Sequence, residues 1–375
     1  MGTLTNIRER MDGLDDRLYR VGQMAGEKRK IKDPRRAKLI EEVTLTEAQK
    51  GEIDRFYLEH YGEKIPYDWH RLYQSFTGTF QVGYFPEFLF GPRLVPDWNP
   101  KEYRIFGDKN LLSVLAGGIP GLRTAKVYGS CTNGIYRNGQ GEIVSFGELK
   151  RQLAEDIADR KVVIKPTTDS SSGRDIRIAA FEGGIEKETR QPLDRFLEET
   201  LKGYKGSWNI QEFIRNPKEL TEIYSGSVNT FRTVTYLWND AFHPAPLVLR
   251  IGRGGHHVDN VHSDGIFVGC SHDGQLRDCA FNQLGERFEK HPDTGTVFKG
   301  YRIPGVVKVL ECAKRMHERL PQMRIVFWDF TLDESGEVVL VEINVNSLGC
   351  WLPQISNGEP LFGNNTAAIL KSLRR

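Results

Sequence analysis

Residues 324–344 read RIVFWDFTLDESGEVVLVEIN, and this stretch organises the interpretation of the whole chain. Two apolar runs, 325–332 and 338–343, flank the turn-forming residues 333–336, which is the pattern of a β-hairpin. Asp329, Glu342 and Asn344 interrupt these runs, at positions where acidic residues are least expected by chance. The hairpin is therefore both a central structural element and a candidate site.

The hairpin register decides whether these polar residues meet. If the loop holds an even number of residues, side-chain alternation puts Asp329 on the same face as Leu340, Glu342 and Asn344. Opposed or diagonal positions then lie about 5 to 8 Å apart. Two carboxylates and an amide oxygen suit Mg²⁺, which accepts few protein ligands and keeps phosphate oxygens and waters. The alternative is a solvated face on which both carboxylates point at water, and the residues alone favour neither.

Composition sets the outer limits. A chain of 375 residues is long enough for two or three domains, and its 52 Lys plus Arg against 50 Asp plus Glu give no bulk charge that would favour nucleic acid. The cysteines are scattered, odd in number and without a Cys-x-x-Cys pair, so we expect a reducing, cytoplasmic setting. No apolar run suits a signal peptide or a membrane span, so we expect no stable membrane insertion.

The N-terminal part gives less information. Residues 1–60 have the pattern of polar helices, and seven of the eleven residues 28–38 are Lys or Arg. This basic run could contact an anionic membrane surface or nucleic acid, but a solvated helix face or connector is the favoured interpretation. The aromatic-rich stretch 57–98 predicts a packed layer beneath the catalytic part.

A second candidate site surrounds Lys165. The short strand 162–166 contains this lysine, and the polar loop 167–173 leads into a second strand, 175–179. Such a loop can fold its N–H groups and hydroxyls over phosphates while the lysine supplies a point charge. The alternative is an ordinary hairpin with a polar tip. The sequence contains no P-loop motif and no protein-kinase signature set, so neither of those two classes applies.

Arginines and histidines mark a third region. Arg232 lies in a predicted strand, 227–238, on the face of Thr230, while Arg250 and Arg253 lie near the end of the apolar run 247–253. Strand arginines usually form edge salt bridges, but beside a nucleotide site they suit bidentate pairing with carboxylate or phosphate.

A zinc site is the other possibility considered for this region. The residues that could supply it are His256, His257, Asp259 and His262. Adjacent histidines point to opposite faces of an extended chain and no thiolate joins them, so loop histidines are favoured over a zinc site.

Six short motifs, taken in order, resemble the ATP-grasp superfamily. They are Asp108-Lys109, Val163-Ile164-Lys165-Pro166 with the loop after it, Gln211-Glu212-Phe213-Ile214, Asn229-Thr230-Phe231-Arg232, Val258-Asp259-Asn260, and Asp329 with Glu342-Ile343-Asn344. The branch most similar to this chain is the sugar-transfer-associated ATP-grasp group, which is linked to surface-polysaccharide synthesis. The resemblance covers roughly residues 70–375.

The resemblance implies an α+β fold in which two α+β lobes clamp ATP, preceded by a helical N-terminal segment. The implied divisions are a helical segment, 1–60, an N-terminal subdomain, 61–130, a lid subdomain, 131–214, and a core subdomain with the metal site, 215–375.

The resemblance also implies roles for individual residues. Lys109 and Lys165 would contact phosphates, and the loop of Ser170, Ser171, Ser172 and Gly173 would act as a mobile lid. Backbone groups of Gln211, Glu212 and Phe213 would pair with adenine, and Glu219 would reach the ribose hydroxyls. Asp329, Glu342 and Asn344 would hold two Mg²⁺ ions. Substrate contacts would come from Asn229, Thr230, Asn260 and His262.

The chain departs from better-known relatives at Phe327, where several of them carry an arginine. The charge that stabilises the transferring phosphoryl group would then come from Arg232, Arg250 or Arg253. A smaller difference is Gln211, since many relatives have an acidic residue there, which matters little if the main chain reads adenine.

The implied activity is that of an ATP-dependent carboxylate–amine ligase, which activates a carboxylate as an acyl phosphate before an amine attacks it. The carboxylate would belong to a sugar acid or amino-acid building block of a surface polysaccharide, or to a small peptide. Two alternatives remain open, an ATP-dependent phosphotransferase of the same fold and a non-catalytic nucleotide-binding partner of a glycosyltransferase complex. Sequence does not identify the acid, the amine or the oligomeric state.

Overall fold

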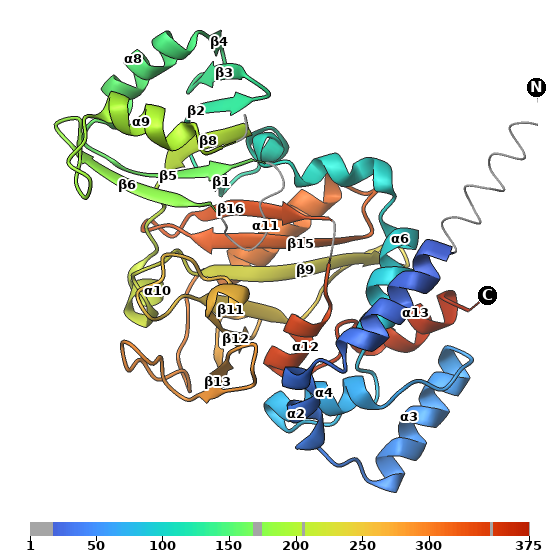
Figure 1. Cartoon of the computed structure of the whole chain (residues 1–375). Coiled ribbons are helices and arrows are strands. Elements are labelled where there is room, and N and C mark those ends of the chain that lie inside the picture. Colours follow the sequence, from blue (N-terminus) through green and yellow to red (C-terminus); the bar gives the residue numbers. More distant parts are fainter. Residues whose placement is uncertain (1–17, 168–174, 205–206, 346–347, 375) are drawn as a thin grey trace, which may run out of the picture.

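Two β-sheets dominate the computed structural model, which describes residues 18–167, 175–204, 207–345 and 348–374 (Figure 1). Within these residues the larger sheet has nine strands. Its path runs β1 (Leu122–Thr124), β16 (Val338–Asn344), β15 (Ile325–Leu332), β9 (Thr230–Trp238), β11 (Leu247–Ile251), β12 (Ile266–Cys270), β13 (Leu276–Phe281) and β14 (Arg287–Phe288), with β10 (Ala241–Pro244) paired to β9. No described helix is long and apolar enough to cross a membrane.

The predicted hairpin is formed by β15 and β16, the third and second strands along this path. Every residue of β15 is buried, as expected of a strand with neighbours on both sides and packing on both faces. Only one pairing in the sheet is parallel among the described strands, that of β1 with β16.

The register of the hairpin differs from the expectation. Its loop, 333–337, holds an odd number of residues, because Leu332 lies opposite Val338, and Leu340 therefore lies opposite Phe330 in the apolar core. A register shift follows, which brings Glu342 opposite Asp329. The expectation that Leu340 shares the face of Asp329 is wrong, and a β-bulge rather than the loop length brings the two carboxylates together.

The smaller sheet forms a separate lobe at the upper left of Figure 1. It has seven described strands in the order β4 (Ile143–Val144), β3 (Ile135–Asn138), β2 (Val127–Thr132), β8 (Ser207–Glu212), β5 (Lys161–Pro166), β6 (Arg177–Glu182) and β7 (Ile185–Glu186). Helices α8 (Phe146–Ile157) and α9 (Leu193–Leu201) pack on it and share its own apolar core.

Helices cover both faces of the larger sheet. One face packs against α11 (Val306–Glu318), α7 (Leu112–Ala116) and α10 (Lys218–Ile223). Part of the other face packs against α2 (Pro34–Glu41), α3 (Glu47–His60), α4 (Asp68–Thr77), α12 (Trp351–Asn357) and α13 (Thr366–Ser372). The rest of that face is turned toward the smaller lobe.

Short helical segments connect these layers. Before α2, residues 18–30 are helical. The remaining segments are α5 (Glu87–Leu89), the π-helical η1 (Phe90–Leu94), α6 (Val95–Trp98), η2 (Lys101–Gly107), η3 (Lys109–Leu111), η4 (Val261–Ser263) and η5 (Gly363–Asn365).

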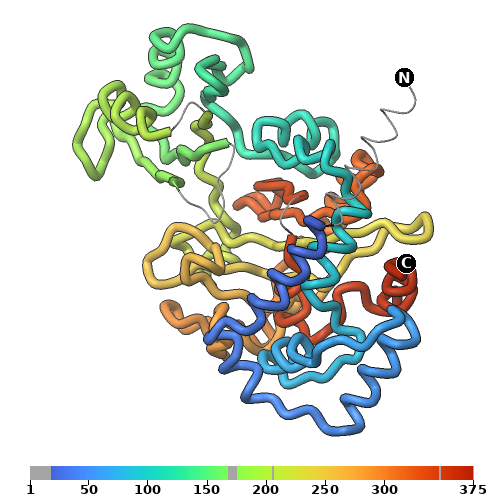
Figure 2. Tube along the Cα trace, turned by 45° about the vertical axis from the view of Figure 1, so that its right-hand side comes forward, coloured from blue at the N-terminus to red at the C-terminus, as the bar shows by residue number. Residues whose placement is uncertain are grey.

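The C-terminal helix α13 lies beside α3 from the N-terminal part, with which it is in contact (Figure 2). Local sequence explains how α3 begins. The Thr46 hydroxyl accepts a hydrogen bond from the Gln49 N–H at 3.2 Å, and the Gln49 side chain accepts one from the Thr46 N–H at 2.9 Å. This reciprocal pair satisfies N–H groups that the first helical turn leaves free.

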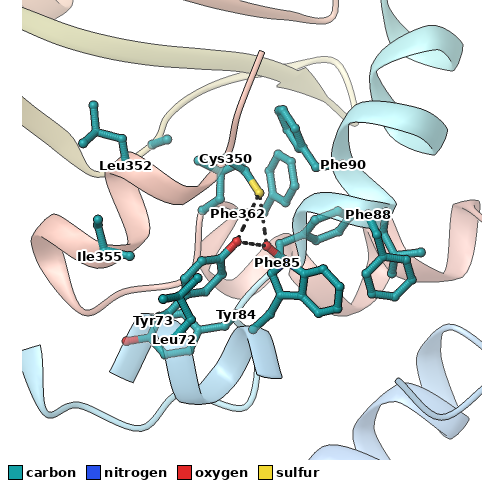
Figure 3. Close-up of a cluster of buried hydrophobic side chains, with 14 of the residues drawn as sticks. Leu72, Tyr73, Tyr84, Phe85, Phe88, Phe90, Cys350, Leu352, Ile355 and Phe362 are labelled. Atoms are coloured by element: carbon teal, nitrogen blue, oxygen red, sulfur yellow. Dashed lines mark hydrogen bonds between the residues drawn. The ribbon is translucent and has the colours of Figure 1, made fainter. Parts of the chain in front are cut away.

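Aromatic side chains join the N-terminal helices to the C-terminal ones. Figure 3 shows Tyr73 and Phe85 grouped around Cys350, whose thiol donates to the Phe85 carbonyl at 3.1 Å. Ring pairs continue the cluster, for example Phe85 with Phe362 at a centroid distance of 5.1 Å. The α+β class and the helical N-terminal segment expected from sequence are therefore confirmed.

Candidate active site

A row of charged side chains crosses neighbouring strands on one face of the larger sheet. Asp329 lies opposite Glu342 on one side and opposite Arg232 on the other, and the next strand places Arg250 opposite Thr230. Opposed residues share a face of the sheet. The row therefore brings acidic and basic groups from β16, β15, β9 and β11 into one place.

Asp329 is the centre of this row. Only 1% of the residue is exposed, and Arg232 pairs with it through Nε to Oδ1 at 2.6 Å and Nη2 to Oδ2 at 3.1 Å. Arg250 donates a further hydrogen bond from Nη2 to Oδ2 at 3.2 Å. A buried carboxylate needs such partners, because its desolvation is costly without them.

Arg250 is itself held in place by its neighbours. Its Nη2 and Nε donate to the Thr230 hydroxyl oxygen at 2.8 and 3.1 Å, and the same hydroxyl donates to Asp259. Burial raises the pKa of the Asp259 carboxyl, against the opposing effect of Arg250. These contacts orient the guanidinium before any ligand arrives.

Two lysines approach from outside the row. Lys109 Nζ lies 2.9 Å from Glu342 Oε1, and Lys165 reaches the cleft from β5 of the smaller sheet. Burial, together with the charge of Lys109, lowers the pKa of Lys165 to about 8. The ammonium of Lys165 is therefore poorly solvated, so an anionic ligand would stabilise it.

These groups line a cavity of about 380 Å³ between the two sheets, a volume within the usual range of small-molecule sites. The smaller sheet and the connection after β8 supply most of the apolar wall, which includes Val163, Ile176, Ile178, Phe213 and Ile214. The larger sheet supplies the charged wall. The shape suits a ligand with a flat apolar part and an anionic part.

The donor set was tested for a divalent metal. Asp329 and Glu342 offer carboxylates and Asn344 an amide group, whose Nδ2 lies 3.5 Å from Asp329 Oδ2. Among the described residues, no cluster of three or more His, Cys, Asp or Glu side chains could hold a metal without further ligands. The residues fit Mg²⁺, which commonly takes one or two carboxylates and completes its shell with phosphate oxygens. Zinc at the loop histidines gains no support from the described residues.

Most of the predicted site residues meet in this cavity. Its lining includes Lys109, Lys165, Gln211, Glu212, Phe213, Thr230, Arg232, Arg250, Asn260, Asp329, Glu342 and Asn344. The predicted lid, Ser170, Ser171, Ser172 and Gly173, lies outside the described residues.

Two predicted charged residues lie elsewhere. Arg253 donates to Asp264 through Nη2 at 2.6 Å and lies over the Phe288 ring. Glu219 lies on α10, where its backbone carbonyl accepts a hydrogen bond from Tyr301. Neither residue belongs to the cavity wall.

Two predicted substrate contacts also lie away from the cavity. Asn229 is fully buried, and its amide donates to the carbonyls of Leu220 and Tyr224. His262 contacts the Gln283 side chain at 3.1 Å. In these two cases a polar residue in or near a motif has a partner within the fold.

Sequence reasoning considered Asp259 only as a disfavoured zinc ligand and gave Val341 no role, although both line the cavity. Asp259 stands inside a motif that was recognised, so its position was a usable signal. Val341 had no signal, because it reaches the wall only through the bulge between β15 and β16.

Comparison with known proteins identifies the class. The family model described as "Sugar-transfer associated ATP-grasp" matches residues 91–369, which is more than half of the chain. The chain belongs to this sugar-transfer-associated ATP-grasp family. No curated protein matches the sequence.

Solved structures give weaker likenesses. The D-alanine-D-alanine ligase from Coxiella burnetii is 12% identical, with 72% of this chain and 57% of that chain covered and a TM-score of 0.39. The VanG D-Ala:D-Ser ligase from Enterococcus faecalis is 12% identical, with 72% of this chain and 61% of that chain covered and a TM-score of 0.39. The L-amino acid ligase from Bacillus licheniformis is 11% identical, with 71% of this chain and 48% of that chain covered and a TM-score of 0.36. This chain thus spans less than two thirds of these solved chains, and at such TM-scores they carry no argument about function.

Proposed function

We propose that the protein is an ATP-dependent carboxylate–amine ligase that forms an amide through an acyl phosphate. The observation that carries the proposal is the row in which Asp329 lies opposite Glu342 and next to Arg232 and Arg250. Carboxylates beside several cations suit a metal-bound polyphosphate and its transfer.

ATP would bind across the cavity between the two sheets. Backbone groups of 211–213 would pair with adenine while the apolar wall packs against its ring. Lys109 and Lys165 would contact the phosphates, and the lowered pKa of Lys165 supports this role, because an anion would stabilise its charge. Residues 170–173 would close over the phosphates as a lid.

Two Mg²⁺ ions would be held by Asp329, Glu342 and Asn344. Bound there, the metal would neutralise charge at the β- and γ-phosphates. Arg232 and Arg250 would orient the substrate carboxylate and stabilise charge on the transferring phosphoryl group. The preformed contacts of Arg250 with Thr230 and Asp259 support this orienting role.

The reaction has two steps. A carboxylate oxygen attacks the γ-phosphorus and the bond to ADP breaks, which gives an acyl phosphate and ADP. The amine nitrogen then attacks the acyl carbon, phosphate leaves with the bonding electrons, and the nitrogen loses a proton to solvent. Enclosure between the lobes would protect the acyl phosphate from water.

The setting of the reaction is also part of the proposal. A building block of a surface polysaccharide would carry the carboxylate, and the description of the family as sugar-transfer associated supports a sugar-linked substrate. The five cysteines are buried and form no disulfide, which supports a reducing, cytoplasmic compartment.

Incubation of the pure protein with Mg-ATP and an array of carboxylate and amine pairs tests the proposal, with ADP and the mass of any amide as readouts. We expect ADP release that requires both substrates and an amide of matching mass. A stable phosphorylated product without an amine requirement would instead establish the phosphotransferase. No ADP with any pair would favour the non-catalytic partner.

The double variant Asp329→Asn with Glu342→Gln supplies the residue-level test. We expect ADP formation to fall at least about 100-fold, the loss typical of removing groups that stabilise transition-state charge. The exposed hairpin-loop residue Glu334 gives a matched control, since Glu334→Gln also neutralises a carboxylate. A folded double variant that kept the parent rate would refute the proposal.

A further inference from the structure

A second cavity, of about 230 Å³, lies between α2, α4 and α12 and the loops at the edge of the larger sheet. It is distinct from the cleft between the lobes, with which it shares no lining residue. Its wall is made of Asp33, Arg35, Arg36, Leu39, Trp69, Leu72, Tyr73, Phe76, Glu87, His262, Gln283, Leu284, Trp351 and Ile355. Figure 3 shows one side of this region, with Leu72 and Tyr73 on α4 and Ile355 on α12.

Aromatic rings provide much of this wall, from Trp69, Tyr73 and Phe76 on one side and Trp351 on the other. Aromatic faces pack well against rigid rings that carry C–H groups on one surface. The polar wall contains donors and acceptors together, among them Gln283 and His262, which hydrogen bond each other at 3.1 Å. Hydroxyl groups, which both donate and accept, suit such a mixture.

The charged side chains of the wall differ in whether they have hydrogen-bond partners. Asp33 caps α2 by accepting from the Arg35 N–H at 3.0 Å, and Glu87 accepts from the Trp351 N–H at 2.7 Å. Burial raises the pKa of Glu87 to about 7, with a further contribution from Glu27. No comparable hydrogen bond or ion pair engages the guanidinium of Arg35 or Arg36 within the described part of the chain. The wall thus holds two carboxylates that accept backbone hydrogen bonds, of which Glu87 also feels the charge of Arg36, and two guanidinium groups with which an anionic ligand can pair.

The cavity adjoins the arginine end of the active-site cleft. Arg250 lies opposite Phe267 across β11 and β12, and the Phe267 ring lies 6.0 Å from Trp351 and 6.3 Å from Phe76 between centroids.

A short loop makes a second connection between the cleft and the cavity. The Asn260 side chain, at the cleft, accepts a hydrogen bond from the backbone N–H of His262, at the cavity, at 2.8 Å. The fully buried Phe267 and the loop 260–262 therefore lie between the cavity and the groups proposed to act on the γ-phosphate.

We propose that this cavity binds a sugar unit that carries an anionic group, as the non-reacting part of the substrate whose separate carboxylate Arg232 and Arg250 orient. The sugar ring packs between Trp69 and Trp351, its hydroxyls bond to Gln283 and His262, and its anionic group pairs with Arg36, assisted by Arg35. The role of this sugar unit as part of the ligase substrate rests on the proposed function, but its binding to the cavity does not require ATP.

Calorimetric titration of the full chain without nucleotide tests the site. The probes are glucuronate, glucose 1-phosphate, glucose and glutamate, which separate a sugar carboxylate, a sugar phosphate, a neutral ring and an anion without a ring. We expect one or both anionic sugars to bind at least about tenfold more tightly than glucose and glutamate, a factor that corresponds to 1.4 kcal/mol. Equal binding of all four, tighter binding of glutamate, or no binding of either anionic sugar would overturn the proposal.

Variants locate the binding. Arg36→Gln and Trp351→Leu are each expected to weaken the anionic sugar about tenfold or more and to leave Mg-ATP affinity unchanged. Arg29→Gln removes the same charge from an exposed position outside the cavity and is expected to have no effect. If Arg36→Gln and Arg29→Gln bind the sugar alike, the cavity is not the site.

The two proposals fail separately. Sugar binding that depends on Arg36, without amide formation from any pair, would overturn the ligase function and leave the cavity assigned. If the protein forms an amide but its affinity for the sugar is the same in the Arg36 and Trp351 variants, only the assignment of the cavity is overturned.

Discussion

At the scale of single residues, the positive charge beside Asp329 comes from two arginines on other strands. Phe327, the position at which the family resemblance leads one to expect an arginine, is buried in the apolar core. Arg232, from the adjacent strand β9, and Arg250, from β11 beyond it, instead pair with Asp329. The positive charge of these arginines thus reaches Asp329 from across the sheet, because opposed strand positions lie close together.

Lys165 provides a pH test. Below pH 8 the buried ammonium is protonated, and above it the group is neutral, since the pKa is lowered to about 8. We expect the Mg-ADP affinity to fall about tenfold from pH 7 to pH 9, because one favourable charge is lost over that interval. Titration calorimetry at several pH values measures this fall.

The control is Lys165→Arg, whose guanidinium stays charged throughout and should flatten the profile. The stability effect has the opposite direction. In the unfolded chain the pKa of this lysine is about 10.4, so between pH 8 and that value the unfolded chain binds more protons than the folded chain. The penalty for burying Lys165 is full below pH 8 and disappears as the pH rises through this window. An affinity that is constant from pH 7 to 9 would contradict a phosphate contact.

At the scale of elements, one side chain links parts of both lobes. Arg123, on β1 of the larger sheet, pairs with Glu212 at the end of β8 and with Asp333 in the hairpin loop, the latter at 2.9 Å. The connection between the lobes and the hairpin that carries Asp329 therefore share one guanidinium.

We expect Arg123→Gln to raise the KM for ATP a few-fold with little change in kcat, because it loosens the lobe connection without touching the reacting groups. The side chain is 29% exposed, so its contacts are worth only about 1 kcal/mol. Steady-state kinetics with varied ATP measures the effect. Arg151→Gln, which breaks ion pairs on the surface of α8, serves as the control, and an equal change in both variants would argue against the linking role.

At the scale of the whole molecule, the N-terminal helices are part of the main core. The family match begins at residue 91, yet α2, α3 and α4 share one apolar cluster with α12, α13 and the larger sheet. The Tyr57 hydroxyl, for example, donates to the Tyr84 carbonyl at 2.6 Å. Helices α2 and α4 also line the second cavity, so they contribute to a site as well as to stability.

We expect Ile53→Ala, at a fully buried position of α3, to lower the free energy of unfolding of the chain by about 2–5 kcal/mol. The exposed neighbour Glu52→Ala should change it little. Denaturant unfolding, followed with a probe in the C-terminal part of the chain, measures this free energy of unfolding. If the N-terminal helices melted alone and left the sheets at their normal stability, the shared core would be disproved.

Much of the hairpin and the strand that carries Lys165 could be predicted, because alternation and turn chemistry act over a few residues. The roles of Arg253, Asn229 and His262 were harder to predict, since their partners come from Asp264, Leu220 and Gln283. A motif shows that a polar residue is present but does not show which way it points.

Local pattern and the order of motifs were enough to predict the α+β class, the acidic hairpin and the ATP-grasp resemblance. The bulge that sets Glu342 opposite Asp329, and the second cavity enclosed by helices from both ends of the chain, emerge only in the folded protein. Register and cavities result from long-range packing, in which each side chain's position depends on residues far away in the sequence.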